Sequence, residues 1–411
     1  MPDLIAIDEA RRRVLALARP LAAEDIALDQ ALGRVLAEEV TSTVDVPPFP
    51  NSAMDGFAVA RGGQGELRVV GEARAGSPSP VAVRPGTAVR ISTGALVPEG
   101  TGTVVPVEQT EPPGRLAPDA GSERADEWVR VLASAPGANI RQPGEDLRAG
   151  QTVLGPGAEL GPAALGVLAS VGRAAVRCAR RPRVAILATG DELVPPGEGL
   201  RPGAIWSSNP VALAGQAVLA GADAGATETV PDAAPATRDA LARALASADV
   251  VCVSGGVSVG PHDHVKGALA ALGAEQRFWG VALRPGKPTW FGTYASGARR
   301  ALVFGLPGNP VSAMVTFQLF VRPALRALQG ADPAAARSTA VLDAGLARNS
   351  SREQAVRCRL RAEADGLHAV PTGPQGSHVL TSMLAADCLA LVAAGEGELA
   401  AGERVEVELL R

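Results

Sequence analysis

Three Gly-rich segments could bind a phosphate-bearing ligand. They read VAILATGDEL (184–193), VVCVSGGVSVG (250–260) and ALVFGLPGNP (301–310), and in each a run of apolar residues leads directly into the glycines. Glycines let backbone N–H groups approach phosphate oxygens, although a single Gly-rich turn is often only a tight turn. The loops at the carboxyl ends of parallel strands meet at one edge of a sheet. Together the three segments therefore predict one anion-binding site.

The side chains in these segments suit an anionic substrate and a hard cation. The residues expected to contact substrate are Gly190, Asp191, Ser254, Gly255, Gly256, Ser258, Gly308, Asn309 and Ser312. Asp191 and Glu192 follow the first strand and Asp263 follows the second loop, and carboxylates are preferred ligands of Mg²⁺ beside phosphates. We expect these three carboxylates to hold Mg²⁺. Asn309 has a second interpretation, because Asn before Pro310 is also a typical helix N-cap.

Lysine is nearly absent from the chain. The only lysines among the 39 basic residues are Lys266 and Lys287, and both lie in or just after Gly-rich loops. A compact ammonium binds an oxyanion as a point charge, which a planar guanidinium does not reproduce. We therefore expect both lysines at the anion site, although a general bias toward Arg could also leave two lysines by chance.

Other metal sites and other classes of partner are disfavoured. His262, Asp263 and His264 lack an evident third histidine or cysteine ligand for zinc. Cys178, Cys252, Cys358 and Cys388 form no CxxC pair, so we expect buried free thiols in a reducing cytoplasm. The net charge of -4 and pI near 5.7 argue against nucleic acid. The acidic N-terminus and the short apolar runs argue against export and against a membrane span.

The pattern of elements predicts several domains. Helical spacing covers 7–18 and 23–37, and a short helix is expected at 161–172. Short strands separated by Gly and Pro indicate a β-rich domain, with strands at 67–70, 88–92, 102–107 and 128–132. Residues 112–127 are polar and are expected to form an exposed hairpin loop. From 183 to 273, strands alternate with Ala-rich helical stretches, which predicts a parallel α/β domain.

Seven motifs in order resemble the signatures of the MoeA and gephyrin C-terminal-region family. They are PPFPNSAMDGFA (47–58), STGALVPEGTGTVV (92–105), GEDL (144–147), TGDEL (189–193), SGGVSVG (254–260), RPGKPTWFG (284–292) and LPGNPVSA (306–313). The resemblance covers nearly the whole chain. It implies a multidomain α/β protein with a parallel α/β molybdopterin-binding domain, similar to the molybdopterin adenylyltransferase fold, and β-rich accessory domains.

The resemblance also implies domain boundaries. The α/β domain would combine 1–26 with 182–329, and a connecting domain would combine 27–44 with 147–181. A β-rich domain would span 45–146, and a C-terminal β-barrel-like domain 330–411. Family members dimerise, so a homodimer with a cleft shared between subunits is expected.

The activity implied is that of a molybdopterin molybdenumtransferase, an enzyme of molybdenum cofactor biosynthesis. It would insert molybdate into adenylylated molybdopterin and release AMP, with Mg²⁺ as cofactor. By their match to the motifs, the residues implied in catalysis are Asp55, Thr93, Asp146, Glu192, Asp263 and Lys287. Arg284, Arg352 and Ser377 would join Lys287 in binding the oxyanion. The partners implied are the small-molecule substrates, a second subunit and, transiently, a molybdopterin adenylyltransferase.

Departures from the family pattern leave two alternatives open. Pro50 stands where many members have Asp, Arg284 where the family often has a second Lys, and Gln354 and Ala355 interrupt a GRxEF-like segment. One alternative is a paralogue that acts with tungstate or at another step of cofactor assembly. The other is a gephyrin-like scaffold, although the chain has no extra domain or long linker for that role.

Overall fold

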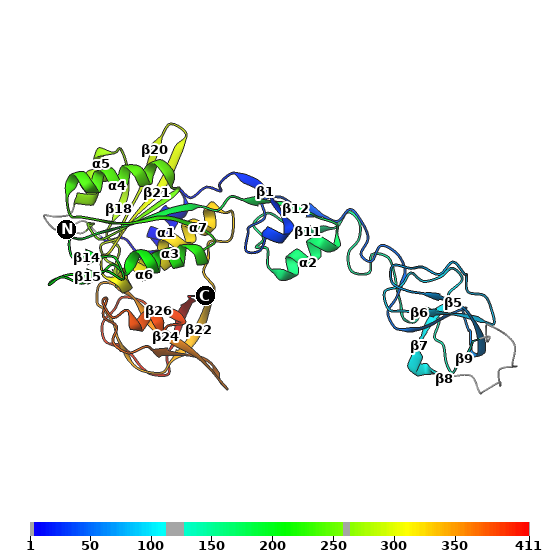
Figure 1. Cartoon of the computed structure of the whole chain (residues 1–411). Coiled ribbons are helices and arrows are strands. Elements are labelled where there is room, and N and C mark those ends of the chain that lie inside the picture. Colours follow the sequence, from blue (N-terminus) through cyan, green and yellow to red (C-terminus); the bar gives the residue numbers. More distant parts are fainter. Residues whose placement is uncertain (1–3, 112–126, 258–263, 411) are drawn as a thin grey trace. The chain divides into compact units, whose positions relative to one another are not determined.

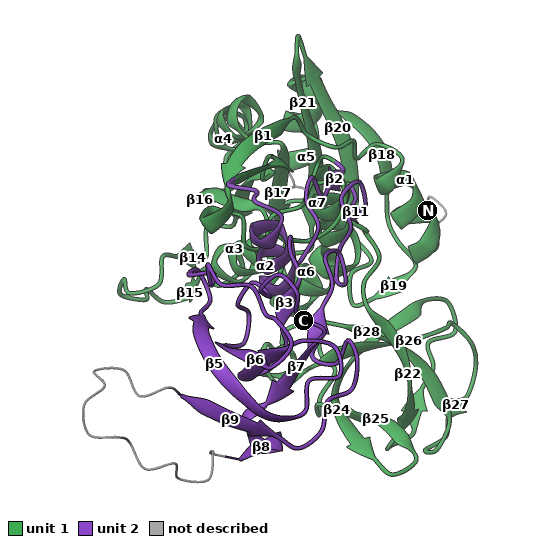
Figure 2. Cartoon of the chain, turned by 90° about the vertical axis from the view of Figure 1, so that its right-hand side faces the viewer, with its two compact units in different colours: residues 1–38, 156–161, 175–411 green, residues 39–155, 162–174 purple. Residues whose placement is uncertain are grey.

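The computed structural model describes residues 4–111, 127–257 and 264–410, which form two compact units (Figures 1 and 2). Unit 1 comprises residues 1–38, 156–161 and 175–411, and unit 2 comprises 39–155 and 162–174. Ser258 and Asp263, and most of the loop expected at 112–127, lie outside the described residues.

A six-stranded sheet forms the centre of unit 1. Its order is β16 (Asp223–Val230), β13 (Arg183–Thr189), β17 (Val250–Ser254), β21 (Arg299–Leu306), β20 (Trp290–Ser296) and β18 (Glu275–Trp279). The first four strands are parallel, and β20 is antiparallel to both of its neighbours. The three strands that run into the Gly-rich loops, β13, β17 and β21, are adjacent, as expected.

Helices cover both faces of this sheet (Figure 1). One face packs against α1 (Ile7–Leu15), α3 (Asn209–Leu219), α6 (Pro310–Thr316), a π-helical turn (Phe317–Val321) and α7 (Arg322–Leu328). The other packs against α4 (Ala234–Ser247) and α5 (His264–Ala271). Along β13, Val184 and Ile186 enter the first core and Ala185 and Leu187 the second. Because successive side chains of a strand point to opposite faces, a strand buried on both sides is a continuous apolar run.

The prediction of a second N-terminal helix at 23–37 is wrong. Residues Ala23–Ala27 form strand β1, which pairs antiparallel with β12 (Ala175–Ala179), and only Leu28–Gln30 form a 3₁₀ turn. The Ala-rich composition favours a helix, but the partner strand, about 150 residues away in sequence, supplies the hydrogen bonds that decide the conformation. Tertiary pairing has overridden local propensity.

The C-terminal residues of unit 1 form a second sheet. Its order is β19 (Leu283–Arg284), β24 (Glu353–Glu363), β25 (Gly366–Pro371), β22 (Arg337–Leu342), β28 (Arg404–Leu409) and β26 (Cys388–Val392), and β24 also pairs with β26. Short elements complete this region: β23 (Leu346–Ala347), β27 (Glu398–Leu399) and α8 (Thr381–Leu384). Ala355, Met383 and Leu389 from this region enter the core beneath the α/β sheet. The two sheets of unit 1 therefore share one hydrophobic core.

Unit 2 contains the β-rich region. Its sheet has the order β7 (Thr103–Pro106), β4 (Gly56–Val59), β6 (Thr87–Ile91), β5 (Gly65–Ala73), β9 (Trp128–Val131) and β8 (Thr110–Glu111). The four strands predicted here are confirmed, and so is the short helix, α2 (Pro162–Ser170). Two small pairs add β2 (Val40–Thr41) with β11 (Thr152–Leu154), and β3 (Asn51–Ser52) with β10 (Ile140–Arg141). Gly56 is required in β4, because a Cβ there would lie 2.0 Å from the carbonyl oxygen of Val105.

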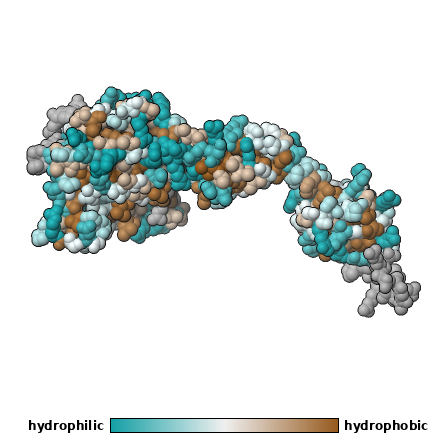
Figure 3. Space-filling model, turned by 45° about the horizontal axis from the view of Figure 1, so that its top comes forward, coloured by the Kyte–Doolittle hydropathy of each residue, from teal (hydrophilic) through white to brown (hydrophobic). Residues whose placement is uncertain are grey.

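The surface mixes polar and apolar residues, and the cysteines are buried. On the face shown in Figure 3, apolar residues lie in small patches between polar ones. Among the described helices, none has the length and apolar character needed to cross a membrane. All four cysteines are buried free thiols, as expected.

Candidate functional site

The three Gly-rich loops lie side by side at the carboxyl edge of the parallel sheet. An ideal Cβ on Gly255 would lie 2.8 Å from the carbonyl oxygen and 3.0 Å from the hydroxyl of Thr189, and Gly255 has a φ of 91°. A Cβ on Gly308 would lie 3.7 Å from the Cα of Gly255. Only glycine fits at position 255 without strain. The backbones of the three loops thus approach one another closely, as the sequence predicts.

Asn209, at the start of α3, fastens two of these loops together. Its side-chain amide donates to the hydroxyl of Ser254 at 2.8 Å and to the carbonyl of Gly308 at 2.7 Å. Ser254, which is buried, also donates to the carbonyl of Pro307 at 3.2 Å. Asn209 is not among the site residues expected from the sequence. An available signal was its Asn-Pro pair at a helix start, which repeats the Asn309-Pro310 pattern.

The loop after β13 presents carboxylates beside an unsatisfied hydroxyl. Asp191 accepts a hydrogen bond from the backbone N–H of Asp232 at 3.0 Å, and the Glu192 carboxylate folds over Gly190, with an oxygen 2.5 Å from its ideal Cβ position. The Thr189 hydroxyl is buried and has no hydrogen-bond partner within the described residues. Carboxylate and hydroxyl oxygens are the donors that Mg²⁺ prefers, so this donor set fits the cation. No group of three metal-binding side chains occurs in the described ranges, and Asp263, the third expected ligand, lies outside them.

The third loop is tied to the C-terminal region of unit 1. The side-chain amide of Asn309 donates to the Ser377 hydroxyl at 3.0 Å, and the N–H of Val311 donates to the Ser377 carbonyl at 3.1 Å. Asn309 occupies the N-cap position of α6, but its side chain makes no capping hydrogen bond. The capping interpretation therefore does not account for this side chain. Ser312 is buried in the first turn of α6.

Two expected oxyanion ligands are brought together by a strand pair. Arg284 lies in β19, which pairs in parallel with the start of β24, and the N–H of Glu353, next to Arg352, donates to the Ala282 carbonyl at 2.9 Å. Lys287, three residues after Arg284, is half-buried. Within the described ranges, none of these three cations makes a side-chain hydrogen bond or ion pair. They are available to a substrate anion.

The departures at Gln354 and Ala355 have structural roles. The Gln354 side chain accepts a hydrogen bond from the N–H of Asn349 at 2.6 Å and so closes the preceding turn. Ala355 is 1% exposed and belongs to the core shared by the two sheets. Both positions therefore support β24, the strand that begins directly after Arg352.

Arg357 is a buried cation beneath the loop that carries Ser377. It is 1% exposed, and it donates to the Ser382 hydroxyl and the Gly376 carbonyl, each at 3.1 Å. Burial lowers the pKa of this guanidinium to about 10. Its backbone N–H donates to the Gln375 side chain at 2.9 Å. The Arg357 guanidinium thus holds Gly376 and Ser382, which precede and follow Ser377 in the sequence.

Lys266 lies on α5 with its ammonium 5.2 Å from the ring centroid of Trp279. The Trp279 indole N–H donates to the carbonyl of Val257 at 2.9 Å. Trp279 therefore contacts both Lys266 and Val257, the last described residue of the second Gly-rich loop. Its role in substrate binding stays a prediction.

In unit 2, the structure brings Asp55 and Thr93 together. The Asp55 carboxylate accepts a hydrogen bond from the backbone N–H of Thr93 at 2.7 Å. Both residues are exposed, as is Asp146. The N–H of Asp146 donates to the Val46 carbonyl at 3.0 Å. Its carboxylate makes no hydrogen bond or ion pair within the described residues.

The fold and the loops define a class of protein: a multidomain α/β protein in which three Gly-rich loops meet at the carboxyl edge of a parallel sheet. Three regions of the chain match known families. Residues 5–172 match the MoeA N-terminal region (domain I and II), 185–327 a probable molybdopterin binding domain, and 339–410 the MoeA C-terminal region (domain IV). The chain belongs to the MoeA family of molybdopterin molybdenumtransferases, transferases of molybdenum cofactor biosynthesis.

Full-length relatives agree with this assignment. A molybdopterin molybdenumtransferase of Haemophilus influenzae is 35% identical and molybdopterin molybdenumtransferase 2 of Mycobacterium tuberculosis is 36% identical, and each match covers 98% of both chains. A crystal structure of the molybdopterin biosynthesis MoeA protein from Pyrococcus horikoshii is 27% identical with a TM-score of 0.80, and the match covers 99% of this chain and 100% of that one. These relatives do not favour the paralogue or scaffold alternatives.

Proposed function

We propose that this chain inserts molybdate into adenylylated molybdopterin and releases AMP, with the three-loop edge of unit 1 as its substrate site. The observation that carries this proposal is the contact of all three loops through Gly255, Asn209 and Ser254. Asn309 of the third loop donates to Ser377, which extends the site to the C-terminal region of unit 1. The domain boundaries implied by the family resemblance, the shared cleft and a cytoplasmic location stay predictions.

The phosphates and the metal would lie at the first two loops. The backbone N–H of Gly256 is the candidate phosphate donor, because those of Gly190 and Gly255 already donate to the carbonyls of Val230 at 3.2 Å and Leu306 at 3.1 Å. Asp191, Glu192 and Asp263 would hold Mg²⁺. Bound Mg²⁺ neutralises phosphate charge and so favours departure of AMP. The Thr189 hydroxyl, which lacks a partner in the described structure, donates to the substrate. The nucleophile comes from molybdate or another substrate group rather than from a protein side chain.

The oxyanion would lie beside Lys287. Lys287, Arg284 and Arg352 donate charge-assisted hydrogen bonds to molybdate oxygens, and the Ser377 hydroxyl, held by Asn309, adds a neutral donor. These groups place molybdate near the dithiolene sulfurs so that Mo–S bond formation is coupled to loss of AMP. Asp55, Thr93 and Asp146 act in the same reaction, and a molybdopterin adenylyltransferase supplies the adenylylated substrate through a transient contact.

A homodimer is supported by an apolar stripe on α3. Val211, Val218 and Leu219 are 65%, 54% and 84% exposed, and their spacing places them on one face of the helix. Exposed apolar faces of this kind are typical of subunit interfaces. Val218→Glu should therefore convert a dimer to a monomer in sedimentation experiments. A wild-type protein that sediments as a monomer at micromolar concentration would contradict the homodimer.

Complementation tests the proposed function. A bacterial strain that lacks its molybdenum insertion step should regain molybdoenzyme activity at low molybdate when it expresses this chain. The variant Lys287→Ala should require much more molybdate for the same rescue. Failure of the wild-type chain at every molybdate concentration, with normal expression, would overturn the proposal and favour the paralogue.

A further inference from the structure

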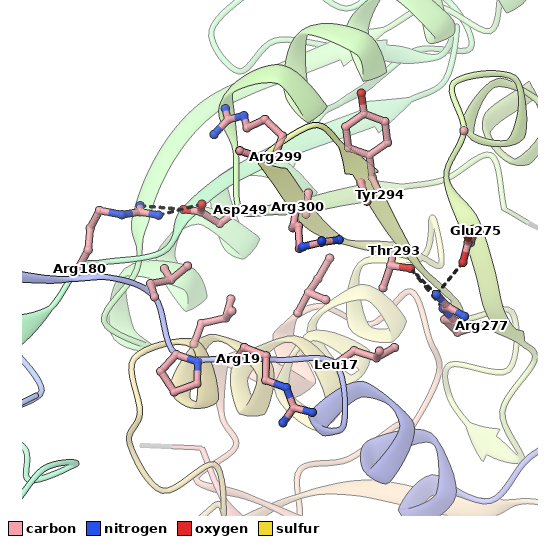
Figure 4. Close-up of a pocket in the computed structure, with 18 residues that line it drawn as sticks. Leu17, Arg19, Arg180, Asp249, Glu275, Arg277, Thr293, Tyr294, Arg299 and Arg300 are labelled. Atoms are coloured by element: carbon pink, nitrogen blue, oxygen red, sulfur yellow. Dashed lines mark hydrogen bonds and ion pairs between the residues drawn. The ribbon is translucent and has the colours of Figure 1, made fainter.

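A cavity lies at the opposite end of the α/β sheet from the proposed catalytic loops. It has a volume of about 600 Å³ and lies between the hairpin β20–β21, strand β18 and the segment that follows α1 (Figure 4). Arg300, near the start of β21, lines it, whereas the Gly-rich loop follows the last residue of that strand. Eight residues of β-strand span roughly 25 Å, so the two sites are separate.

The lining of this cavity is strongly basic in a chain with a net charge of -4. Five arginines line it against two carboxylates: Arg19, Arg180, Arg277, Arg299 and Arg300 against Asp249 and Glu275. Both carboxylates are already engaged. Asp249 accepts two hydrogen bonds from Arg180 at 2.9 Å and one from the N–H of Arg183 at 2.8 Å. Glu275 accepts one from Arg277 at 2.6 Å.

Two of the arginines are available to a ligand. In the described part of the chain, neither Arg19 nor Arg300 makes a side-chain hydrogen bond or ion pair, and both are exposed. Arg277 holds the Thr293 hydroxyl with two hydrogen bonds, at 3.1 and 3.2 Å. Figure 4 shows Arg19, Arg277 and Arg300 around one open space, whereas Arg299 extends away from it. Because neighbouring side chains on a strand point to opposite faces, the Arg299 and Arg300 side chains extend in different directions, although both residues line the cavity.

Four leucines give part of the lining an apolar character. Leu17 and Leu21 from the segment after α1, Leu302 from β21 and Leu328 from α7 line the same space. The N–H of Leu21 donates to the Leu328 carbonyl at 2.8 Å, which holds the segment in place. A cavity of this size that combines an apolar lining with a few charged groups suits a small organic ligand.

We propose that this cavity binds a small organic phosphate of nucleoside monophosphate size. Arg19 and Arg300 hold the phosphate by charge-assisted hydrogen bonds, with Arg277 and Thr293 beside them, and the leucines contact the organic part. Guanidinium groups bind phosphate through paired N–H donors, which favours a dianion over a single carboxylate. The proposal is independent of the catalytic assignment, because it uses none of the same residues.

Hydrogen–deuterium exchange with AMP as the probe tests this site. AMP should slow exchange in the hairpin 290–306 and in segment 17–21 of the full-length protein. The double variant Arg19→Ala/Arg300→Ala should lose this protection and weaken AMP binding there by about tenfold or more. The control Arg359→Ala/Arg404→Ala removes two exposed arginines elsewhere in unit 1 and should keep the protection. Any protection at 254–257 and 307–313, where the catalytic loops lie, should be the same in all three proteins.

Three results would overturn the proposal. The first is protection by AMP only at the catalytic loops. The second is protection of the hairpin that persists unchanged in the double variant, whose folding is checked by its thermal melting. The third is that inorganic phosphate protects the hairpin as well as AMP does at the same concentration, because the leucines would then contribute nothing to ligand binding.

Discussion

The side-chain amide of Asn309 donates a hydrogen bond to the hydroxyl of Ser377 across 3.0 Å, and this bond joins the loop after β21 to the C-terminal sheet of unit 1. The backbone of the same loop is held to Ser377 by the N–H of Val311. Behind Ser377 lies Arg357, which holds the Gly376 carbonyl. The third Gly-rich loop and Ser377 are thereby held in one arrangement.

A double-mutant cycle tests whether this bond matters to catalysis. Asn309→Ala and Ser377→Ala should each lower kcat/KM for adenylylated molybdopterin, and the double variant should be little worse than either single one. Removing either partner releases the same loop, so a coupling energy of about 1 kcal/mol is expected. Additive losses would show that the two side chains contact the substrate independently.

Glu192 should set the Mg²⁺ requirement of the enzyme. Glu192→Ala should raise the Mg²⁺ concentration for half-maximal AMP release by about tenfold, because one carboxylate ligand of a hard cation is lost. Glu198→Ala is a matched control, since Glu198 is an exposed carboxylate a few residues further along the same segment. Unchanged Mg²⁺ dependence of Glu192→Ala would assign this carboxylate a structural role.

The ion pair between Arg11 and Glu408 should contribute strongly to stability. Arg11 of α1 pairs with Glu408 of β28, whose side chain is fully buried, and Arg337 lies 3.6 Å from the same carboxylate. Arg11→Ala should lower the free energy of unfolding by about 3 kcal/mol, because it leaves a buried charge poorly compensated. Arg12→Ala, which removes an exposed pair with Glu9, should cost less than about 1 kcal/mol. Urea denaturation measures both values, and equal losses would contradict this account.

His368 should make stability depend on pH. Hydrogen bonds from its two ring nitrogens to Asp343 and Asp365 raise the pKa of this imidazole above 6.5. Because the pKa of His368 is higher in the folded protein than in the unfolded one, protonation of His368 stabilises the fold fully at pH values below the unfolded-state pKa. This stabilisation is lost as the pH rises through the folded-state pKa. The Tm difference between wild type and His368→Gln should therefore be largest near pH 5.5 and shrink toward pH 8.5. A difference that stays constant over this range would exclude the protonated His368 as its source.

The sequence predicted the meeting of the three Gly-rich loops well because its signals are local. Each strand that ends at the site is an apolar run followed by glycine, and the order of β13, β17 and β21 in the sheet follows from the parallel α/β pattern. The misassigned helix at 23–37 had no such signal, because β1 is fixed by a partner at 175–179. Asn209 and the arginine-lined cavity were also missed. Their roles depend on contacts such as Asn209 with Gly308, about 100 residues apart, which no local spacing reveals.

Molybdate-dependent AMP release by the purified protein is the sharpest test of the proposed reaction. With adenylylated molybdopterin and Mg²⁺, the wild-type chain should release AMP as molybdate is added and should form a cofactor that activates a molybdenum-free apoenzyme. Lys287→Ala should need at least about tenfold more molybdate, with its free energy of unfolding changed by less than about 0.5 kcal/mol, because a half-buried loop cation without an ion pair in the described structure contributes little to folding. An identical molybdate dependence in both proteins, or no AMP release by the wild type at any molybdate concentration, would contradict the account.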